Sequence, residues 1–173
     1  MAKTGIPGLL APGGSPIGPP RAPTEQNVDA ESLTAPNPLS DSVAMNLTTF
    51  SGYGGKLLFY HGVSDPWFSP LDTLEYYEKM TGANGGTEKV MQWSRFYFIP
   101  GMGHCSGGEA ALDRPDMLGA VVDWVEKGIA PDSVVATGKA FPGRSRPLCA
   151  YPQRAQYKGQ GDPEDARNFS CRE

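Results

Sequence analysis

The sequence predicts an α/β fold with an incomplete parallel sheet, preceded by a Pro- and Gly-rich arm. Two short apolar segments, residues 56–60 and 95–99, have the length and composition of buried strands. Each is followed by a loop that contains Gly and Pro and then by a helical pattern, which is the order of elements in parallel α/β sheets. Two such strands are few for a sheet, so we expect further chain or another subunit to complete it.

Residues 1–40 are predicted to form an extended or disordered arm, because eight of them are Pro, five are Gly and none is aromatic. The alternative is a segment that becomes ordered only against the surface of a partner. The remaining residues, 41–173, suffice for one modest core and are predicted to be a partial α/β domain. This domain opens with a mildly amphipathic stretch, residues 41–50, which we interpret as a short helix.

The first predicted strand leads through a polar loop into a helix with clear start and stop signals. Ser69 is placed to cap the helix N-terminus, Pro70 takes the first helical position and Asp72 is an approximate capping-box partner. We expect the helix to run to about Met80 and to stop at Gly82.

The second predicted strand stops at Pro100, and a tight loop shaped by glycines follows. A second helix is predicted from Arg114 to Gly128. Its apolar stripe is expected to pack on the sheet and comprises Leu118, Val121, Val122 and Val125. Residues 134–137 are predicted to be a last short strand. From Gly138 onward the chain is rich in Gly and Pro and is expected to form irregular surface.

Two loops carry side chains suited to acid–base chemistry. His104 lies at the tip of the Gly-rich loop after the second strand, where a general base is held rigidly yet open to solvent. Asp65 follows the first strand, so the two residues are predicted to meet as the acid and base of a Ser-Asp-His triad. The alternative for Asp65 is a turn cap before Pro66. We interpret His61, the only other histidine, as a hydrogen-bonding loop residue.

The chain contains three cysteines, an odd number. Cys149 and Cys171 both lie in the tail, 22 positions apart, and the simplest pairing joins them and leaves Cys105 unpaired. Such a disulfide predicts a secreted or periplasmic protein, an inference that fails if all three cysteines are reduced thiols. Residues 1–20 lack the continuous apolar segment of a secretory signal, so we expect none there.

Charge and hydropathy exclude several classes of partner. The net charge is −4 and no Lys/Arg cluster is present, which argues against nucleic-acid binding. No segment approaches the length of about 20 apolar residues that a membrane span requires. Two His and three Cys show no zinc-ligand spacing, so no metal site is expected.

Four stretches of the sequence resemble the C-terminal part of the tannase and feruloyl esterase family, in the family's order. They are GGKLLFYHGVSDPWFSP, FIPGMGHCSGG, VDWVEKGIAPD and RPLCAYPQRAQYKGQGD followed by NFSC, which together span residues 54–171. The resemblance implies an α/β-hydrolase fold and hydrolysis of aromatic carboxylic esters such as gallates or ferulates. It implies that Asp65 is the triad acid, that His104 is the base, and that no cofactor is needed beyond a family calcium site in a lid region not seen here.

The resemblance also bears on the cysteines. Cys149 and Cys171 match a disulfide of the family's tail. Cys105 matches the cysteine that pairs, in the family, with the residue just before the nucleophilic serine, and it is therefore expected here as an unpaired or inter-segment thiol.

The sequence departs from the family in lacking a nucleophile elbow. No G-x-S-x-G stands upstream of Asp65, and Ser15 lies in the Pro-rich arm, which is unsuited to a strand-turn-helix elbow. Ser106 is a weak candidate, because one loop would have to supply both the nucleophile and the base. Cys105 is no better, since side chains adjacent in sequence diverge. We therefore expect a C-terminal fragment or truncated homologue, with the nucleophile supplied by residues outside this sequence.

Two functions follow from these expectations. The first is an aryl-ester hydrolase acting on a small aromatic ester, to which this chain supplies the acid and base. The alternative is a catalytically inactive homologue that serves as an oligomerising or binding module. In either case we expect self-association, because a partial sheet exposes strand edges. The large aromatic residues are expected mainly in the core, although two of them are close enough to Asp65 to line a site; the set is Trp67, Phe68, Trp93 and Trp124.

Overall fold

The computed structural model describes residues 44–173, so the predicted arm and the start of the predicted helix at 41–50 lie outside the described residues. The helices are α2 (Thr48–Gly52), α3 (Pro70–Ala83), α4 (Thr87–Val90), α5 (Met117–Lys127) and the 3-10 helix η2 (Ala166–Asn168). The strands are β1 (Leu57–Gly62), β2 (Ser94–Ile99), β3 (Arg114–Pro115), β4 (Ser133–Thr137), β5 (Arg146–Cys149), β6 (Arg154–Tyr157) and β7 (Phe169–Arg172).

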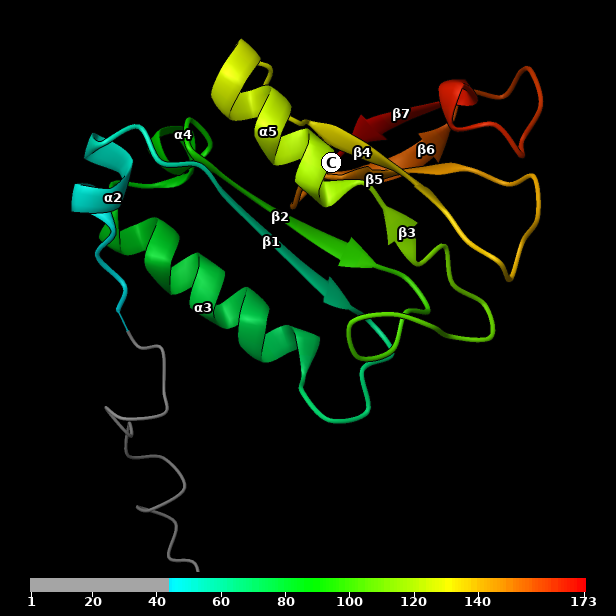
Figure 1. The fold of residues 1–173 in the computed structure, drawn as a ribbon, viewed down its shortest axis with the longest axis horizontal. Helices are drawn as coiled ribbons and strands as arrows, with labels where there is room; N and C mark the ends of the chain where they lie inside the picture. The colour runs from blue at the N-terminus through cyan, green and yellow to red at the C-terminus, as the bar shows by residue number, and fades with distance from the viewer. Residues whose placement is uncertain (1–43) are drawn as a thin grey trace, which may run out of the picture. The chain divides into compact units, whose positions relative to one another are not determined.

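Strands β1 and β2 form the parallel pair that the two apolar segments predict. Leu57 pairs with Ser94 and the register continues without interruption to Gly62 and Ile99. Both strands therefore end at the same edge, and the loops that follow them emerge together (Figure 1). Strand β1 extends two residues beyond the predicted 56–60, so His61 belongs to the strand and not to the loop.

The two longer helices cover opposite faces of the β1–β2 pair, as Figure 1 shows. Helix α3 begins as predicted: the Ser69 side chain accepts a hydrogen bond from the Leu71 N–H, and Pro70 is the first helical residue. The helix passes Gly82 and ends at Ala83. The short helix α4 was not predicted, and α2 lies at the end of the predicted 41–50 segment and continues beyond it.

Strand β2 separates two hydrophobic clusters, because alternate side chains point to opposite faces of a strand. Tyr97 and Ile99 lie in the cluster beneath α5 and the β4–β5 hairpin. Phe96 and Phe98 contribute to the cluster with α3 and α4. Both faces of β2 are buried, which explains why its sequence is apolar at consecutive positions and does not alternate with polar residues.

Helix α5 turns a different face to the sheet from the one predicted. Three of the four residues of the predicted stripe are exposed: Leu118, Val122 and Val125. Instead Trp124 is buried with 4% of its surface exposed, and Met117 and Ala120 pack on the same side. This face is buried because the Trp124 side chain removes more surface from water than a valine does. The Trp124 ring also packs against the Arg95 guanidinium, whose central carbon lies 4.9 Å from the ring centroid.

The tail is more regular than its Gly- and Pro-rich composition predicts. Strand β5 joins β3 and β4 in an antiparallel sheet, and β6 pairs with β7. Leu148 and Ala150 lie in the core, and the Tyr151 N–H donates to the Phe96 carbonyl, which links the tail to β2. The expected disulfide between Cys149 and Cys171 is present and fastens β5 to β7.

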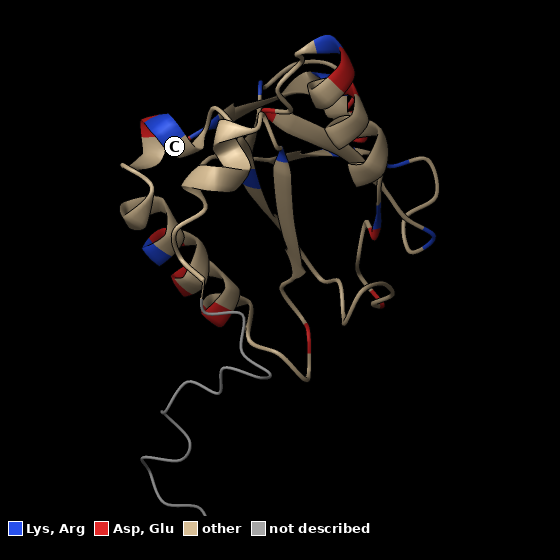
Figure 2. Cartoon of the chain, turned by 60° about the vertical axis from the view of Figure 1, so that its left-hand side comes forward, with Lys and Arg blue, Asp and Glu red and all other residues tan. Residues whose placement is uncertain are grey.

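Acidic and basic positions are interspersed along the chain, as Figure 2 shows. Two pairs among the described residues lie within one helix: Lys79 with Glu75 in α3 and Lys127 with Asp123 in α5. Within residues 44–173 no helix is both long and apolar enough to cross a bilayer.

Candidate active site

The loops after β1 and β2 are joined through their backbones. The Val63 N–H donates to the Ile99 carbonyl and the Ser64 N–H to the Met102 carbonyl, which continues the ladder past the strand ends. Gly62 allows this approach: a β-carbon at that position would lie 2.3 Å from the Gly103 carbonyl oxygen. The absence of a side chain at Gly62 therefore sets the distance between the two loops.

The Asp65 carboxylate is at once a turn cap and a partner of His104. Its Oδ1 accepts hydrogen bonds from the N–H groups of Trp67 (2.9 Å) and Phe68 (3.1 Å), and its Oδ2 accepts from Nδ1 of His104 at 2.8 Å. The turn-cap contacts and the predicted contact with His104 thus occur together, one at each oxygen of the carboxylate. Only 3% of the side chain is exposed.

The environment keeps the Asp65 carboxylate ionised. Burial raises its pKa, but the hydrogen bonds from His104, Trp67 and Phe68, together with the charge of His104, outweigh burial and lower the pKa to about 2. An ionised carboxylate at this position holds the His104 imidazole with its proton on Nδ1 and stabilises the imidazolium when the ring is protonated.

His104 is presented by a tight loop in which Gly101 has φ 72°, in the left-handed region that glycine adopts readily. Its side chain is 35% exposed. Among the described residues Nε2 has no hydrogen-bond partner, while Nδ1 is held by Asp65. A neutral imidazole with a free Nε2 lone pair can take a proton from a hydroxyl group, which is the role of a general base.

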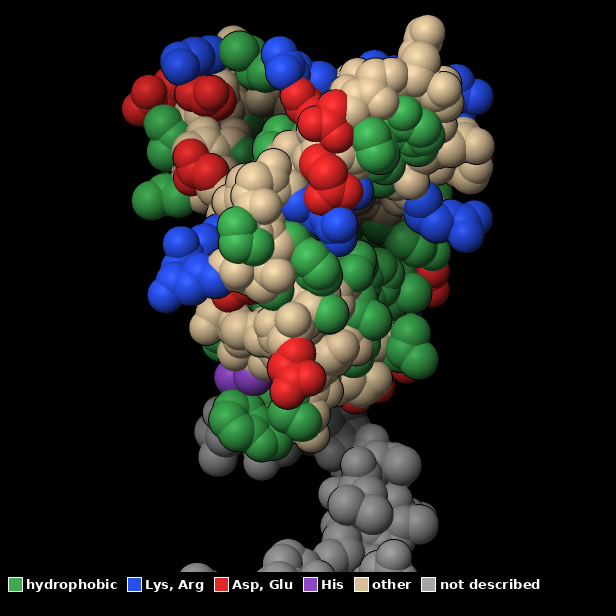
Figure 3. Space-filling view, turned by 90° about the vertical axis from the view of Figure 1, so that its right-hand side faces the viewer, with side chains coloured by type: hydrophobic (Ala, Val, Ile, Leu, Met, Phe, Trp, Pro, Cys, Tyr) green, Lys and Arg blue, Asp and Glu red, His purple; other side chains and the backbone are tan. Residues whose placement is uncertain are grey.

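Two aromatic rings flank His104. The ring centroids of Trp67 and Phe68 lie 5.0 and 5.3 Å from that of His104. The expectation that these two residues belong to the core is wrong: they are 74% and 60% exposed, because the Asp65 turn directs them outward. Trp93 and Trp124, in contrast, are buried as expected. In Figure 3 a histidine is visible at the surface beside hydrophobic side chains.

Neither weak nucleophile candidate is arranged to attack with help from His104. Ser106 is exposed and its N–H donates to the His104 carbonyl, but within residues 44–173 its hydroxyl makes no hydrogen bond to the imidazole. Cys105 has φ 64°, an uncommon conformation for a residue with a side chain, and its thiol is free and exposed.

His61 makes the local hydrogen bonds expected of it, but its place beside the site was missed. Its Nδ1 lies 2.8 Å from the Thr73 hydroxyl, its Nε2 lies 3.2 Å from the Phe68 carbonyl oxygen, and the same Nε2 lies 3.3 Å from Oδ2 of Asp65. The only sequence feature that could have placed His61 beside Asp65 is their spacing of four residues. This spacing does not bring two side chains together unless the chain turns between them.

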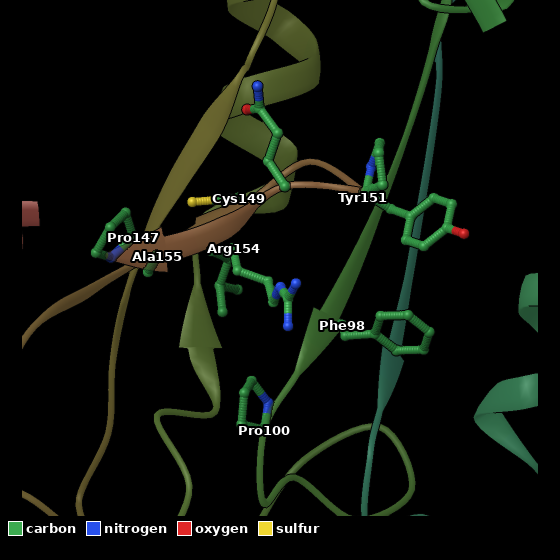
Figure 4. A pocket seen from close by; sticks show the side chains of 10 residues that line it. Phe98, Pro100, Pro147, Cys149, Tyr151, Arg154 and Ala155 are labelled. Carbon is green, nitrogen blue, oxygen red and sulfur yellow. The ribbon is translucent and has the colours of Figure 1, made fainter. Parts of the chain in front are cut away.

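A separate cavity of about 540 Å³ lies between β2 and the β5–β6 segment. Phe98, Pro100, Tyr151 and Arg154 line part of it, as Figure 4 shows. Its lining includes neither Asp65 nor His104. Among residues 44–173 no group of three or more His, Cys, Asp or Glu side chains could hold a metal ion.

Comparison with known proteins identifies relatives of the chain. The family model for tannase and feruloyl esterase matches residues 22–172. Mono(2-hydroxyethyl) terephthalate hydrolase of Piscinibacter sakaiensis is 46% identical over 136 residues, which cover 75% of this chain and 22% of that protein. Probable feruloyl esterase B-2 of Aspergillus terreus is 36% identical over 165 residues, covering 83% of this chain and 31% of its own length.

Solved structures agree with these relatives. Feruloyl esterase B from Aspergillus oryzae superposes with a TM-score of 0.64 at 28% identity, covering 75% of this chain and 29% of that one. Tannin acyl hydrolase from Aspergillus niger superposes with a TM-score of 0.60 at 28% identity, over 74% of this chain and 24% of that one. The fold is accordingly that of the α/β-hydrolases, and the chain spans less than a third of the length of these relatives. The matched family model and the extent of these similarities establish that the chain belongs to the tannase and feruloyl esterase family.

Proposed function

We propose that the chain supplies the acid and the base of a serine carboxylic ester hydrolase that acts on small aromatic esters. The observation that carries the proposal is the hydrogen bond between Oδ2 of Asp65 and Nδ1 of His104, with Nε2 of His104 directed away from it. Family membership supports ester hydrolysis as the reaction.

The two residues take distinct roles in the proposed reaction. Nε2 of His104 removes the proton from a serine hydroxyl as its oxygen attacks the ester carbonyl carbon, and Asp65 stabilises the resulting imidazolium. The imidazolium then returns the proton to the departing alcohol, which leaves an acyl-enzyme. Water, deprotonated by the same nitrogen, attacks the acyl carbon and releases the carboxylic acid and the serine.

The serine and the oxyanion hole come from residues outside this sequence. The sequence holds no nucleophile elbow, and the Ser106 hydroxyl makes no hydrogen bond to His104 within the described residues. No cofactor takes part in the proposed chemistry, since the serine, the imidazole and the carboxylate account for every proton transferred.

The aromatic substrate class rests on the surroundings of His104. Trp67 and Phe68 place two exposed rings about 5 Å from the imidazole, so an aryl ester can contact them while its carbonyl lies near Nε2. Two relatives also have names that refer to aromatic esters, a terephthalate ester and feruloyl esters.

A chimeric enzyme tests the proposal directly. The matching 136-residue segment of the Piscinibacter sakaiensis hydrolase is replaced by the corresponding residues of this chain, and hydrolysis of mono(2-hydroxyethyl) terephthalate is measured. We expect activity in the chimera, its loss with His104→Ala and a fall in kcat of about 10⁴-fold with Asp65→Asn. Ser106→Ala serves as the control and should leave kcat unchanged. A folded chimera that is inactive, or one that stays active with His104→Ala, would refute the proposal.

The origin of the nucleophile is tested on the chain alone. A fluorophosphonate reacts with activated serines, and mass spectrometry locates the modified residue. We expect no labelled serine and no turnover of a chromogenic aryl ester by the isolated chain. Labelling of Ser106 that disappears with His104→Ala would place the nucleophile in this chain and overturn that part of the proposal.

An oligomerising module is the second candidate, and the exposed apolar residues favour it. Leu118 and Val125 of α5 are 74% and 62% exposed, and Tyr60 on β1 is 47% exposed. A second copy of the chain is the proposed occupant of the β1 edge, because strand β1 pairs only with β2 among the described strands and can accept another strand. Sedimentation at micromolar concentration should then show a dimer, whereas a monomer would exclude this candidate.

We also propose that the chain functions in a secreted or periplasmic setting. The disulfide between Cys149 and Cys171 supports this, because such bonds form and persist in oxidising compartments. Mass spectrometry of protein alkylated in the native host would find both cysteines oxidised if the proposal holds, and alkylated if it does not.

A further inference from the structure

His61 lies beside the same Asp65 carboxylate that His104 contacts. It is the fifth residue of β1, and 13% of its side chain is exposed. Its Nε2 is 3.3 Å from Oδ2 of Asp65, the same oxygen that accepts from His104. Both histidines of the chain therefore lie near one oxygen of the proposed acid.

The hydrogen-bond partners of His61 determine where its proton is. The Phe68 carbonyl oxygen, 3.2 Å from Nε2, can only accept, so Nε2 carries the proton. Nδ1 then has a lone pair in the neutral ring, and it accepts from the Thr73 hydroxyl at 2.8 Å. The neutral tautomer of His61 is thus the opposite of that of His104, whose proton is on Nδ1.

These contacts connect His61 to the turn that carries Asp65. Nε2 of His61 donates to the Phe68 carbonyl, and the Phe68 N–H donates to Oδ1 of Asp65. Oδ2 of Asp65 accepts from Nδ1 of His104, and Nε2 of His61 lies 3.3 Å from the same oxygen without a hydrogen bond to it. Thr73, in the first turn of α3, connects His61 to the helix. The Phe68 backbone is therefore held at its carbonyl by His61 and holds the carboxylate through its N–H.

We propose that His61 is a positioning residue for the triad: its Nε2–H holds the Phe68 carbonyl, the Phe68 N–H holds the Asp65 carboxylate, and the carboxylate so placed fixes the proton of His104 on Nδ1. Thr73 sets the tautomer of His61 on which this depends. The inference deepens the proposed function and rests on Asp65 acting as the partner of the catalytic base.

Nitrogen-15 NMR of the imidazoles tests the inference in the intact chain. The sequence has two histidines, and long-range proton–nitrogen correlations distinguish a protonated ring nitrogen from an unprotonated one. At a pH where both rings are neutral, we expect opposite tautomers: His61 protonated on Nε2 and His104 on Nδ1. A His61 ring protonated on Nδ1 would point a lone pair at the Phe68 carbonyl oxygen and would refute the proposal without any substitution.

Two substitutions separate positioning from a merely structural role. His61→Phe keeps a ring but removes the donor, whereas His61→Gln retains an N–H near the position of Nε2. In each variant His104 is the only imidazole. We expect the His104 nitrogens in His61→Phe to move to shifts that average the two tautomers, and those in His61→Gln to keep most of the Nδ1–H form. A structural role alone would lower the unfolding free energy of His61→Phe and leave the His104 tautomer unchanged, which would overturn the inference.

A second pair of variants keeps the test decisive if His61→Phe fails to fold. Thr73→Val removes the hydroxyl that donates to Nδ1 of His61 at nearly constant volume, and Thr73→Ser keeps a hydroxyl. We expect averaged His61 nitrogen shifts only in Thr73→Val; averaged shifts in neither variant would refute the role of Thr73. These measurements need no turnover, so the positioning result is independent of the chimera assay that tests ester hydrolysis.

Discussion

Oδ2 of Asp65 lies 2.8 Å from Nδ1 of His104, although 39 positions separate the two residues in the sequence. The contact follows from the parallel register of β1 and β2, which places Gly62 opposite Ile99 and lets both loops leave the sheet at one edge. Two backbone hydrogen bonds then tie the loops together, so Asp65 and His104 are carried by two loops that are joined directly.

The first prediction concerns Gly62→Ala. The added β-carbon would meet the Met102 and Gly103 carbonyl oxygens at 2.4 and 2.3 Å, so the two loops must separate. We expect a loss of about 1–3 kcal/mol in the free energy of unfolding in urea, together with loss of the fixed His104 tautomer. The control is Gly82→Ala in α3, where a β-carbon meets nothing within 4 Å and should stabilise by about 0.5–1 kcal/mol. Equal effects of the two substitutions would contradict the role given to Gly62.

The second prediction concerns the pH dependence of stability. The pKa of Asp65 is lowered to about 2 in the folded chain, below the value near 3.9 of an unperturbed aspartate. Its contribution is therefore fully present above the unperturbed pKa and is lost as the pH falls through about 2. We expect the wild type to exceed Asp65→Asn in unfolding free energy near neutral pH, and the difference to shrink between about pH 4 and pH 2. If the difference in unfolding free energy between the wild type and Asp65→Asn stays constant from about pH 4 to about pH 2, the ionised carboxylate does not contribute to stability.

Features that depend on a few neighbouring residues, such as helix caps and strand ends, could be predicted from the sequence. The contact between Asp65 and His104 could be expected but not established from the sequence. The Ser69 cap, Pro70 at the helix start and the Pro100 strand end are signals read within a few residues, and the structure has all three. That Asp65 and His104 touch depends on strand register, which is set by packing between distant segments. His61 shows the same limit, since its contacts with Thr73 and Phe68 exist only after the turn has formed.

The third prediction compares exposed and buried aromatic residues. Trp67 is 74% exposed and Trp93 is 7% exposed. Trp67→Ala should change the unfolding free energy by no more than about 0.5 kcal/mol, while Trp93→Ala should lower it by about 3–5 kcal/mol. In the chimera we expect Trp67→Ala to raise KM for the aryl ester with little change in kcat. A large loss of stability with Trp67→Ala would mean that this ring is structural and does not contact substrate.

The fourth prediction concerns the tail. Cys149 and Cys171 enclose a loop with a sequence separation of 22, for which the chain-entropy model gives a stabilisation of about 3 kcal/mol. Paired Cys149→Ser and Cys171→Ser substitutions should lower the unfolding free energy by roughly that amount. Reductant should have the same effect on the wild type and none on the double variant. Cys105→Ser is the matched control, and a comparable loss there would indicate that Cys105 is not the unpaired thiol.

The tail and helix α5 show where sequence patterns mislead. Strands β5, β6 and β7 are four residues each, too short for their alternation to stand out among Gly and Pro, and they are specified by pairing with distant partners. In α5 the spacing of the valines is as regular as that of Met117, Ala120 and Trp124, so periodicity alone cannot choose the face. The buried area of Trp124 decides it, and that depends on Arg95 lying beneath the ring.

The free, exposed thiol of Cys105 has a practical consequence. Two of the three cysteines of the chain are bonded to each other, and the third sits exposed next to His104. A maleimide dye added to oxidised protein will therefore attach at a single position, directly beside His104. Its emission provides an optical reporter of ligands arriving at the site, built into the natural sequence and independent of any turnover.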